Sequence, residues 1–146
     1  MSPEQAEGKA DVDERTDVFN MGSVLFEILT HRNLFFGTEL DEVLKMILED
    51  PIPEPREVAP REDIPPALNA ICYKALQKDP NDRYQTMNEF RDDLLAYRNG
   101  EPVSVYGYTL RERIQQFNER HLISLTAIGS AAAGAVVCWF LLTFSR

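Results

Sequence analysis

The residues of this sequence whose types could do chemistry are few, and their spacing does not assemble a site. His31–Gly37 reads HRNLFFG, which places a His-Arg pair and a Phe-Gly pair close together, and no aspartate adjoins either pair. The two histidines, His31 and His121, lack the short spacing of zinc ligands. The two cysteines, Cys72 and Cys138, are interpreted as buried thiols rather than a disulfide. We therefore predict no catalytic, cofactor-binding or metal-ligating residue.

The charge balance excludes one class of partner. The chain of 146 residues carries 24 acidic and 15 basic side chains, a net charge of -9, and its length suits one modest domain. The acidic excess lies in residues 1–108, which hold 22 acidic and 11 basic side chains, a difference of -11. No face of such a body gathers enough Lys and Arg to neutralise a phosphate backbone, so we predict no nucleic-acid partner.

Residues 122–144, LISLTAIGSAAAGAVVCWFLLTF, carry no charge. As a helix this run is long enough to cross a bilayer, which needs about 20 apolar residues, so it predicts one transmembrane helix. The basic residues that precede it outnumber the single Arg146 that follows, which places residues 1–121 in the cytoplasm. Small residues inside the run would permit close helix pairing and a homodimer through the span, although such residues are also common in unpaired spans. These candidate pairing residues are Gly129, Ser130, Ala133 and Gly134.

The remaining elements that position any site read as short helices. Helices are expected at 16–30, at 38–48, from Pro66, and at 86–98, with capping boxes at Thr38 and Thr86. The first of these is apolar on all sides, which is typical of a helix in the middle of a fold. Asp50–Pro66 is Pro-rich and cannot form one continuous helix. The predicted fold class is mainly α, and a third capping box at Thr109 starts a helix leading into the predicted span.

Three short motifs follow one another in a diagnostic order: MSPE at 1–4, DVFNMG at 17–22 and DPNDR at 79–83. Together they resemble the last third of the catalytic domain of the bacterial transmembrane Ser/Thr protein kinases. The resemblance implies that residues 1–98 are a partial kinase domain, its large C-terminal lobe (C-lobe) from the end of the activation segment onward. Residues 99–121 would then be a juxtamembrane linker and amphipathic helix, and 122–144 the span in a bacterial inner (plasma) membrane.

The resemblance also implies roles for single residues. Pro3 and Glu4 would close the activation segment, and Glu4 would pair with Arg83, whose planar guanidinium suits a clamp on a carboxylate. Asp17 would cap the central helix and, in the family, hold the backbone of the catalytic loop. Gly22 is costly inside a helix, which indicates the close packing of another backbone.

What the sequence lacks decides the expected activity. It has no G-x-G-x-x-G, no H-R-D and no D-F-G, the loops that hold ATP, magnesium and the substrate hydroxyl in a kinase. Because the chain begins inside the motif that ends the activation segment, a truncated reading frame is favoured. ATP and Mg²⁺ are implied only for an intact parent, and this chain is expected to be inactive. The HRNLFFG stretch follows the central helix, where the family has a T-G-x-x-P-F turn, so its likeness to catalytic loops is coincidental.

An alternative from another class is a non-catalytic, membrane-anchored scaffold. Such a protein would bind kinases or protein substrates through the helix after Thr38 and the Pro-rich segment. Stability distinguishes the two hypotheses, because a fragment should leave part of the central helix facing water. We expect this of several of its apolar residues, namely Phe19, Val24, Phe26 and Ile28, and we expect residues 1–108 alone to aggregate or to lack fixed packing.

Overall fold

The described part of the chain is helical. The computed structural model describes residues 1–9 and 12–109, and within these ranges the chain forms helices and no strand. The elements are α1 (Pro3–Ala6), α2 (Glu14–Thr30), α3 (Leu40–Leu48), α4 (Pro55–Val58), α5 (Pro66–Ala75), the 3₁₀ turn η1 (Pro80–Asp82) and α6 (Met87–Arg98). Met1–Gly107 form one compact unit, and the fold described below is the fold of that unit.

The fold class predicted from the sequence, a mainly α kinase lobe with one C-terminal transmembrane helix, is wrong in its membrane part. No helix in the described ranges is both long and apolar enough to cross a bilayer. The longest, α2, has 17 residues and carries charges in its first and last turns, including Glu14 and Glu27, whereas a span needs about 20 mainly apolar residues. The run 122–144 and its candidate helix-pairing residues lie outside the described residues.

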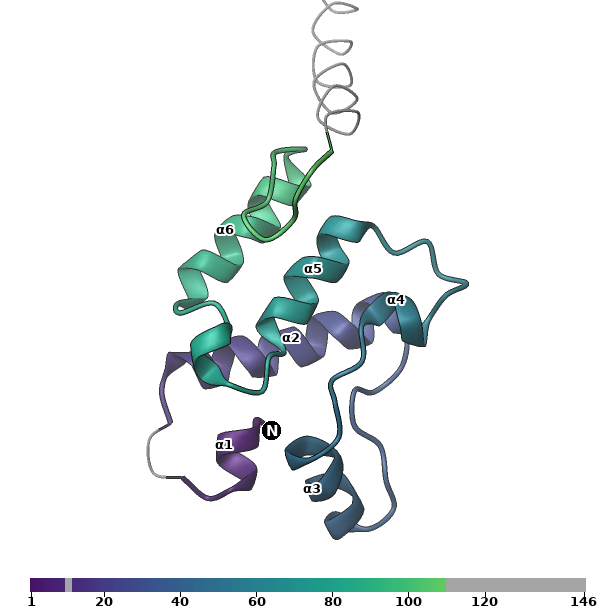
Figure 1. Cartoon of the computed structure of the whole chain (residues 1–146), viewed down its shortest axis with the longest axis vertical. Helices are drawn as coiled ribbons and strands as arrows, with labels where there is room; N and C mark the ends of the chain where they lie inside the picture. Colours follow the sequence, from purple (N-terminus) through teal and green to yellow (C-terminus); the bar gives the residue numbers. More distant parts are fainter. Residues whose placement is uncertain (10–11, 110–146) are drawn as a thin grey trace, which may run out of the picture. The chain divides into compact units, whose positions relative to one another are not determined.

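α2 is the element around which the unit is built. It contacts α4, α5 and α6, while α1 contacts α3. Figure 1 shows α5 and α6 on one side of α2 and α1 and α3 on the other. The centre of the core is the cluster of Phe19, Phe26, Cys72 and Leu76, which are all buried. Burial raises the pKa of the Cys72 thiol to about 12, so the thiol stays protonated and is an apolar core group.

One side of α2 is uncovered. Met21, Val24 and Ile28 lie on it at helical spacing and are 46%, 48% and 63% exposed. Phe19 and Phe26 are fully buried instead, because α5 covers their side of the helix and Phe35 stacks on Phe19 at 6.4 Å. The all-round apolar pattern of α2 therefore indicated a central helix correctly but overstated how much of it the described residues enclose.

The helix starts differ in part from the sequence prediction. α2 begins at Glu14 with Asp13 as its N-cap, so Asp17 lies inside the first turn and is not the cap. The capping box expected at Thr38 is absent, because α3 begins at Leu40 after Glu39, which makes no side-chain cap bond. The Thr86 hydroxyl does cap α6, accepting from the Glu89 amide at 3.1 Å. Proline at the first position of α5 is Pro66, as predicted.

His31 ends α2 in a conformation that L residues adopt reluctantly. It has φ +54° and ψ +30°, and its amide donates to the Glu27 carbonyl at 2.8 Å. This left-handed position after a helix is usually glycine, which has no Cβ to clash with the neighbouring carbonyl. In the turn after α2, His31 thus adopts the left-handed conformation that usually requires glycine, and the backbone there is strained.

Gly22 lies where α5 comes closest to α2. A Cβ added at Gly22 would stand 2.9 Å from the Ala75 Cβ and 3.2 Å from a methyl carbon of Leu76. The Cys72 thiol also lies 3.6 Å from the Gly22 carbonyl oxygen. The missing side chain lets the two helices approach, as the cost of a mid-helix glycine indicated, although the nearest atoms are side-chain carbons rather than backbone.

We expect Gly22→Ala to destabilise the chain. The added methyl overpacks the contact at a cost of about 1–3 kcal/mol, which exceeds the gain of about 1 kcal/mol from better helix propensity. Thermal unfolding followed by circular dichroism measures the change. Ala75→Gly in the Gly22→Ala background should recover part of the loss, since it removes the opposing Cβ. Gly107→Ala is the control, because no atom lies within 4 Å of its Cβ position.

We expect His31→Gly to stabilise the chain by about 0.5–1 kcal/mol, since relief of the left-handed strain exceeds the extra chain entropy of glycine. The same unfolding measurement tests it. Asn33→Gly is a matched control in the same loop, because Asn33 has no positive φ and its replacement should not stabilise. Equal effects of the two substitutions would contradict the strain assigned to His31.

Candidate functional site

The most developed polar site in the unit is a buried clamp between Glu4 and Arg83. Within residues 1–9 and 12–109 no group of three or more His, Cys, Asp or Glu side chains could hold a metal ion. The two partners lie 79 positions apart in the sequence, on segments that have little regular structure of their own. The clamp is therefore a tertiary feature, and its construction begins with those two segments.

Local capping positions both partners. Ser2 caps the single turn of α1: the Ser2 hydroxyl accepts from the Gln5 amide, and the Gln5 side chain accepts from the Ser2 amide at 2.9 Å. Pro3 at the first helical position suits this start. On the other side, the Asp79 carboxylate caps η1 by accepting from the Asn81 amide at 2.8 Å. Each short turn thus presents one long side chain in a defined direction.

The ion pair is bidentate. Arg83 Nη1 donates to Glu4 Oε1 at 2.8 Å, and Arg83 Nη2 donates to Glu4 Oε2 at 2.9 Å. The Arg83 side chain is 0% exposed and that of Glu4 is 8% exposed. Two parallel hydrogen bonds between planar groups fix direction as well as distance, which a lysine ammonium could not do.

Every N–H of the Arg83 guanidinium has an acceptor. Nε donates to the Gln77 carbonyl at 2.7 Å, and Nη2 also donates to the Lys78 carbonyl at 3.0 Å. Nη1 donates its second hydrogen to the Arg15 carbonyl at 3.0 Å. With the two bonds to Glu4 this uses all five donors. The guanidinium also lies 4.8 Å from the ring centroid of Phe19, a cation–π contact.

Glu4 is held in its charged form. Burial alone would raise the pKa of this carboxyl, but the hydrogen bonds from Arg83 and Thr16 outweigh burial and lower the pKa to about 2. The Thr16 hydroxyl donates to Glu4 Oε1 at 2.6 Å. A carboxylate this well satisfied is a poor proton acceptor near neutral pH, so the clamp is structural rather than catalytic.

The clamp joins three parts of the chain. Glu4 comes from α1, Thr16 and the Arg15 carbonyl from the start of α2, and the Gln77 and Lys78 carbonyls from the segment between α5 and η1. Sequence reasoning missed the contributions of Thr16 and of the three carbonyls. A threonine beside a helix start carries no distinctive signal, and backbone carbonyls carry none.

The structure leaves the other predicted motif residues apart from the clamp. Asp17 is exposed on the first turn of α2 and forms no ion pair with Arg83, whose partner is Glu4. Asp13 instead accepts from the Arg15 amide and side chain, and Arg15 reaches Asn81 at 3.0 Å. These hydrogen bonds lie outside the clamp and join the start of α2 to η1. Gly22 acts separately, at the α2–α5 contact.

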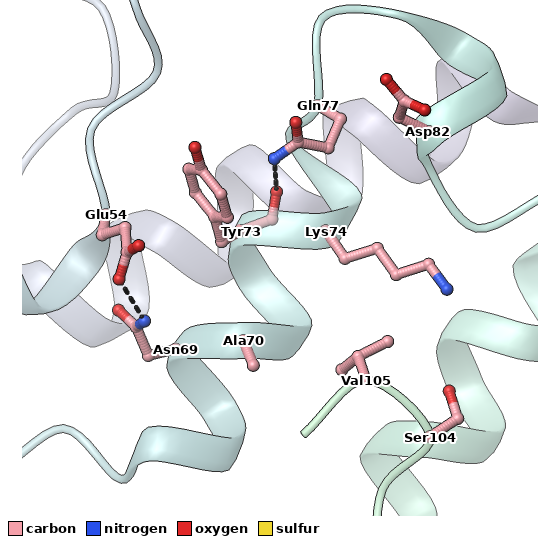
Figure 2. Close-up of a pocket in the computed structure, with 9 residues that line it drawn as sticks. All are labelled: Glu54, Asn69, Ala70, Tyr73, Lys74, Gln77, Asp82, Ser104 and Val105. Atoms are coloured by element: carbon pink, nitrogen blue, oxygen red, sulfur yellow. Dashed lines mark hydrogen bonds between the residues drawn. The ribbon is translucent and has the colours of Figure 1, made fainter. Parts of the chain in front are cut away.

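A second polar site lies where sequence reasoning expected only a linker. Ser104 and the buried residues Tyr84 and Asp93 form one hydrogen-bonded group, so the compact unit continues past α6 to Gly107. An open groove runs beside it between α5 and the residues after α6, as Figure 2 shows. Its lining is mixed, with Lys74 and Tyr73 on α5 and Ser104 and Val105 opposite. No pattern in the sequence predicted this hydrogen-bonded group or the groove beside it.

We expect Glu4→Gln to remove most of the acid sensitivity that the clamp causes. Because the folded pKa of about 2 lies below the ordinary value of 4.5, Glu4 stabilises the fold above pH 4.5, and this stability is lost as pH falls toward 2. The contribution at neutral pH is about 3 kcal/mol. Thermal unfolding of the full chain from pH 7 to pH 2.5 should show a lower Tm for Glu4→Gln at pH 7 and a shallower fall below pH 4.5. Glu7→Gln, on the exposed Lys9 pair, is the control and should leave the profile unchanged.

Comparison with known proteins places this geometry in context. No protein-family profile matches the chain. It is 43% identical over 102 residues, 69% of its length, to the serine/threonine-protein kinase PknB of Mycolicibacterium smegmatis. It is 44% identical over 103 residues, 70% of its length, to PknB of Mycobacterium tuberculosis. It is also 39% identical over 146 aligned positions, 92% of its length, to the tyrosine-protein kinase MasK of Myxococcus xanthus.

The chain spans only 16% of either PknB protein and 22% of MasK. The match to MasK covers too much of the chain to end at Gly107, so the similarity extends beyond the compact unit. The clamp and the central helix are features that the resemblance to protein kinases implied from the sequence. Over about 70% of its length the chain is therefore homologous to a segment of bacterial protein kinases, which supports its identification as a fragment of a kinase C-lobe.

Proposed function

We propose that residues 1–98 are the C-terminal part of the large lobe of a bacterial protein kinase, whose intact parent transfers a phosphoryl group from ATP to protein serine or threonine. The observation that carries the proposal is the buried Glu4–Arg83 clamp. By the resemblance to the family, Glu4 lies at the end of the activation segment. The role of these residues is then to hold that segment against α2 rather than to react.

The relatives support Ser/Thr specificity in the parent by their names, since the two PknB proteins are named serine/threonine kinases. MasK is named a tyrosine kinase, so proteins similar to this chain are named for both substrate specificities. The clamp is compatible with either specificity, because Glu4 and Arg83 bond to each other and to neighbouring groups of the lobe rather than to an acceptor hydroxyl. The proposal assigns the chain a supporting part in phosphoryl transfer and leaves the choice of hydroxyl to other segments of the parent.

By itself the chain is proposed to be inactive. Phosphoryl transfer needs groups that hold the nucleotide phosphates, magnesium and the acceptor hydroxyl, and the sequence has none of the loops that supply them. ATP and Mg²⁺ belong to the intact parent. The uncovered side of α2, with Val24 and Ile28 exposed, is suited to packing against further parts of a kinase domain.

The alternative, a non-catalytic scaffold that binds kinases or their substrates, draws on a different surface. Phe36, in the loop before α3, and Leu40, the first residue of α3, are 72% and 68% exposed. Large apolar side chains that are exposed four residues apart mark a candidate contact surface for another protein. An exposed contact surface fits a scaffold, and it also fits a lobe that packs against the rest of a kinase. A direct test is needed to distinguish the kinase fragment from the scaffold.

A chimera provides that test. Residues 1–107 of this chain replace the matching segment of PknB from Mycolicibacterium smegmatis, and phosphorylation of a generic protein substrate is measured with Mg²⁺ and ATP. We expect the chimera to be active and the chain alone to be inactive. Arg83→Met in the chimera should lower activity by about tenfold or more, because the activation segment loses its anchor. Arg91→Met, on an exposed pair with Asp92, is the matched control and should have little effect.

An inactive chimera that is nevertheless folded would contradict the proposed function. If the chain alone then binds an intact kinase, and Phe36→Ser abolishes that binding, the scaffold hypothesis is favoured. Magnesium-dependent phosphorylation by the chain alone would overturn its proposed inactivity.

A further inference from the structure

The residues after α6 fold back onto the lobe. Asn99 ends the helix, and Gly100, with φ +69°, reverses the chain so that the Glu101 amide donates to the Ala96 carbonyl at 2.7 Å. Residues 101–107, named the strap below, then run along α6, as the green segment of Figure 1 shows. Val103 is only 4% exposed, so the strap has one apolar anchor in the core.

The polar anchor of the strap is the carboxylate of Asp93 on α6, which is 7% exposed. Ser104 donates to it twice, from its amide to Oδ1 at 2.7 Å and from its hydroxyl to Oδ2 at 2.8 Å. The Tyr84 hydroxyl donates to Oδ2 at 2.8 Å. Within the described residues no Lys, Arg or His forms an ion pair with Asp93. A buried negative charge thus depends on neutral donors, and most of them come from one serine.

Ser104 combines this role with access from solvent. Ser104 is exposed and lies in a segment without helix or strand, at the rim of the groove in Figure 2. Lys74, the cation on the opposite wall, lies over the Tyr84 ring at 4.6 Å from its centroid. The groove also contains the carboxylates of Glu54 and Asp82, so its field does not favour a further anion.

We propose that Ser104 is a phosphorylation site and that its modification releases the strap from the lobe. The Ser104 oxygen attacks the γ-phosphorus of a nucleoside triphosphate bound to a protein Ser/Thr kinase. The bond from that phosphorus to its bridging oxygen breaks, the diphosphate leaves, and the hydroxyl proton passes to a base of the kinase. The proposal goes beyond the proposed function and does not depend on it, since any protein Ser/Thr kinase can supply the phosphoryl group.

Phosphorylation of Ser104 and docking of the strap on Asp93 exclude each other. A phosphorylated oxygen cannot donate to Asp93, and the phosphate would bring a charge of about -1.5 to -2 against a buried carboxylate whose oxygen now lies 2.8 Å away. In the docked strap the hydroxyl is engaged by Asp93, so the kinase must capture it when the strap opens. Phosphorylation then keeps the strap open, and Val103 leaves the core with it.

The release is tested on the full chain with phosphoserine installed at position 104 by genetic encoding. Hydrogen exchange read by mass spectrometry reports on residues 101–107. We expect protection there to fall by about tenfold or more, with α2 and α5 unchanged. Ser104→Ala is the matched control and should lose less protection, because it keeps the amide bond to Asp93. Unchanged protection, as would follow if the phosphate simply paired with Lys74, would overturn the proposal.

The acceptor role is tested separately. The full chain and a free peptide of residues 99–109 are incubated with a bacterial protein Ser/Thr kinase domain, Mg²⁺ and ATP, and the initial rate at Ser104 is followed. We expect the peptide to react faster than the folded chain, and Val103→Ser to bring the chain toward the peptide rate by loosening the strap without touching Asp93. Absence of phosphate on Ser104 in both the chain and the peptide, or equal rates for the wild-type chain and the peptide, would overturn it.

Discussion

The unit depends above all on one buried charge. The guanidinium of Arg83 is removed from water, and such a group is tolerated only when its donors are satisfied and its charge is paired. Its five acceptors come from α1, from the start of α2 and from the segment between α5 and η1, and a movement of any of these segments would leave part of the buried charge unpaired. The position of α1, a single turn with little stability of its own, follows from this constraint.

The rest of the lobe is arranged around the same helix. The start of α2 contributes the Arg15 carbonyl and Thr16 to the clamp. The middle of α2 packs against α5 at Gly22, and the helix ends at its C-cap, His31. The close approach at Gly22 is what lets Cys72 and Leu76 meet the aromatic side chains of α2 in a dry core. The side of α2 that this packing leaves uncovered is compatible with a lobe that functions as part of a longer kinase.

Two buried carboxylates in this unit are satisfied in different ways. Glu4 faces a cation that is itself buried, so its bonds persist until the pH approaches the lowered pKa of the carboxyl. Asp93 faces hydroxyl and amide donors, and two of its three bonds come from a serine that solvent reaches. The first arrangement suits a permanent joint, and the second suits a contact that a covalent change can open.

The sequence predicted the helical class from its periodicity, and it identified the clamp partners only through the resemblance of its three ordered motifs to those of protein kinases. It also identified Gly22, since a glycine inside a helix needs a packing reason. The folded chain was needed to show that Asp13 caps α2, that Thr16 and three carbonyls complete the clamp, and that the strap belongs to the compact unit. Hydrogen bonds from backbone carbonyls and from single hydroxyl groups leave no periodic trace in a sequence, and they form only where distant segments meet.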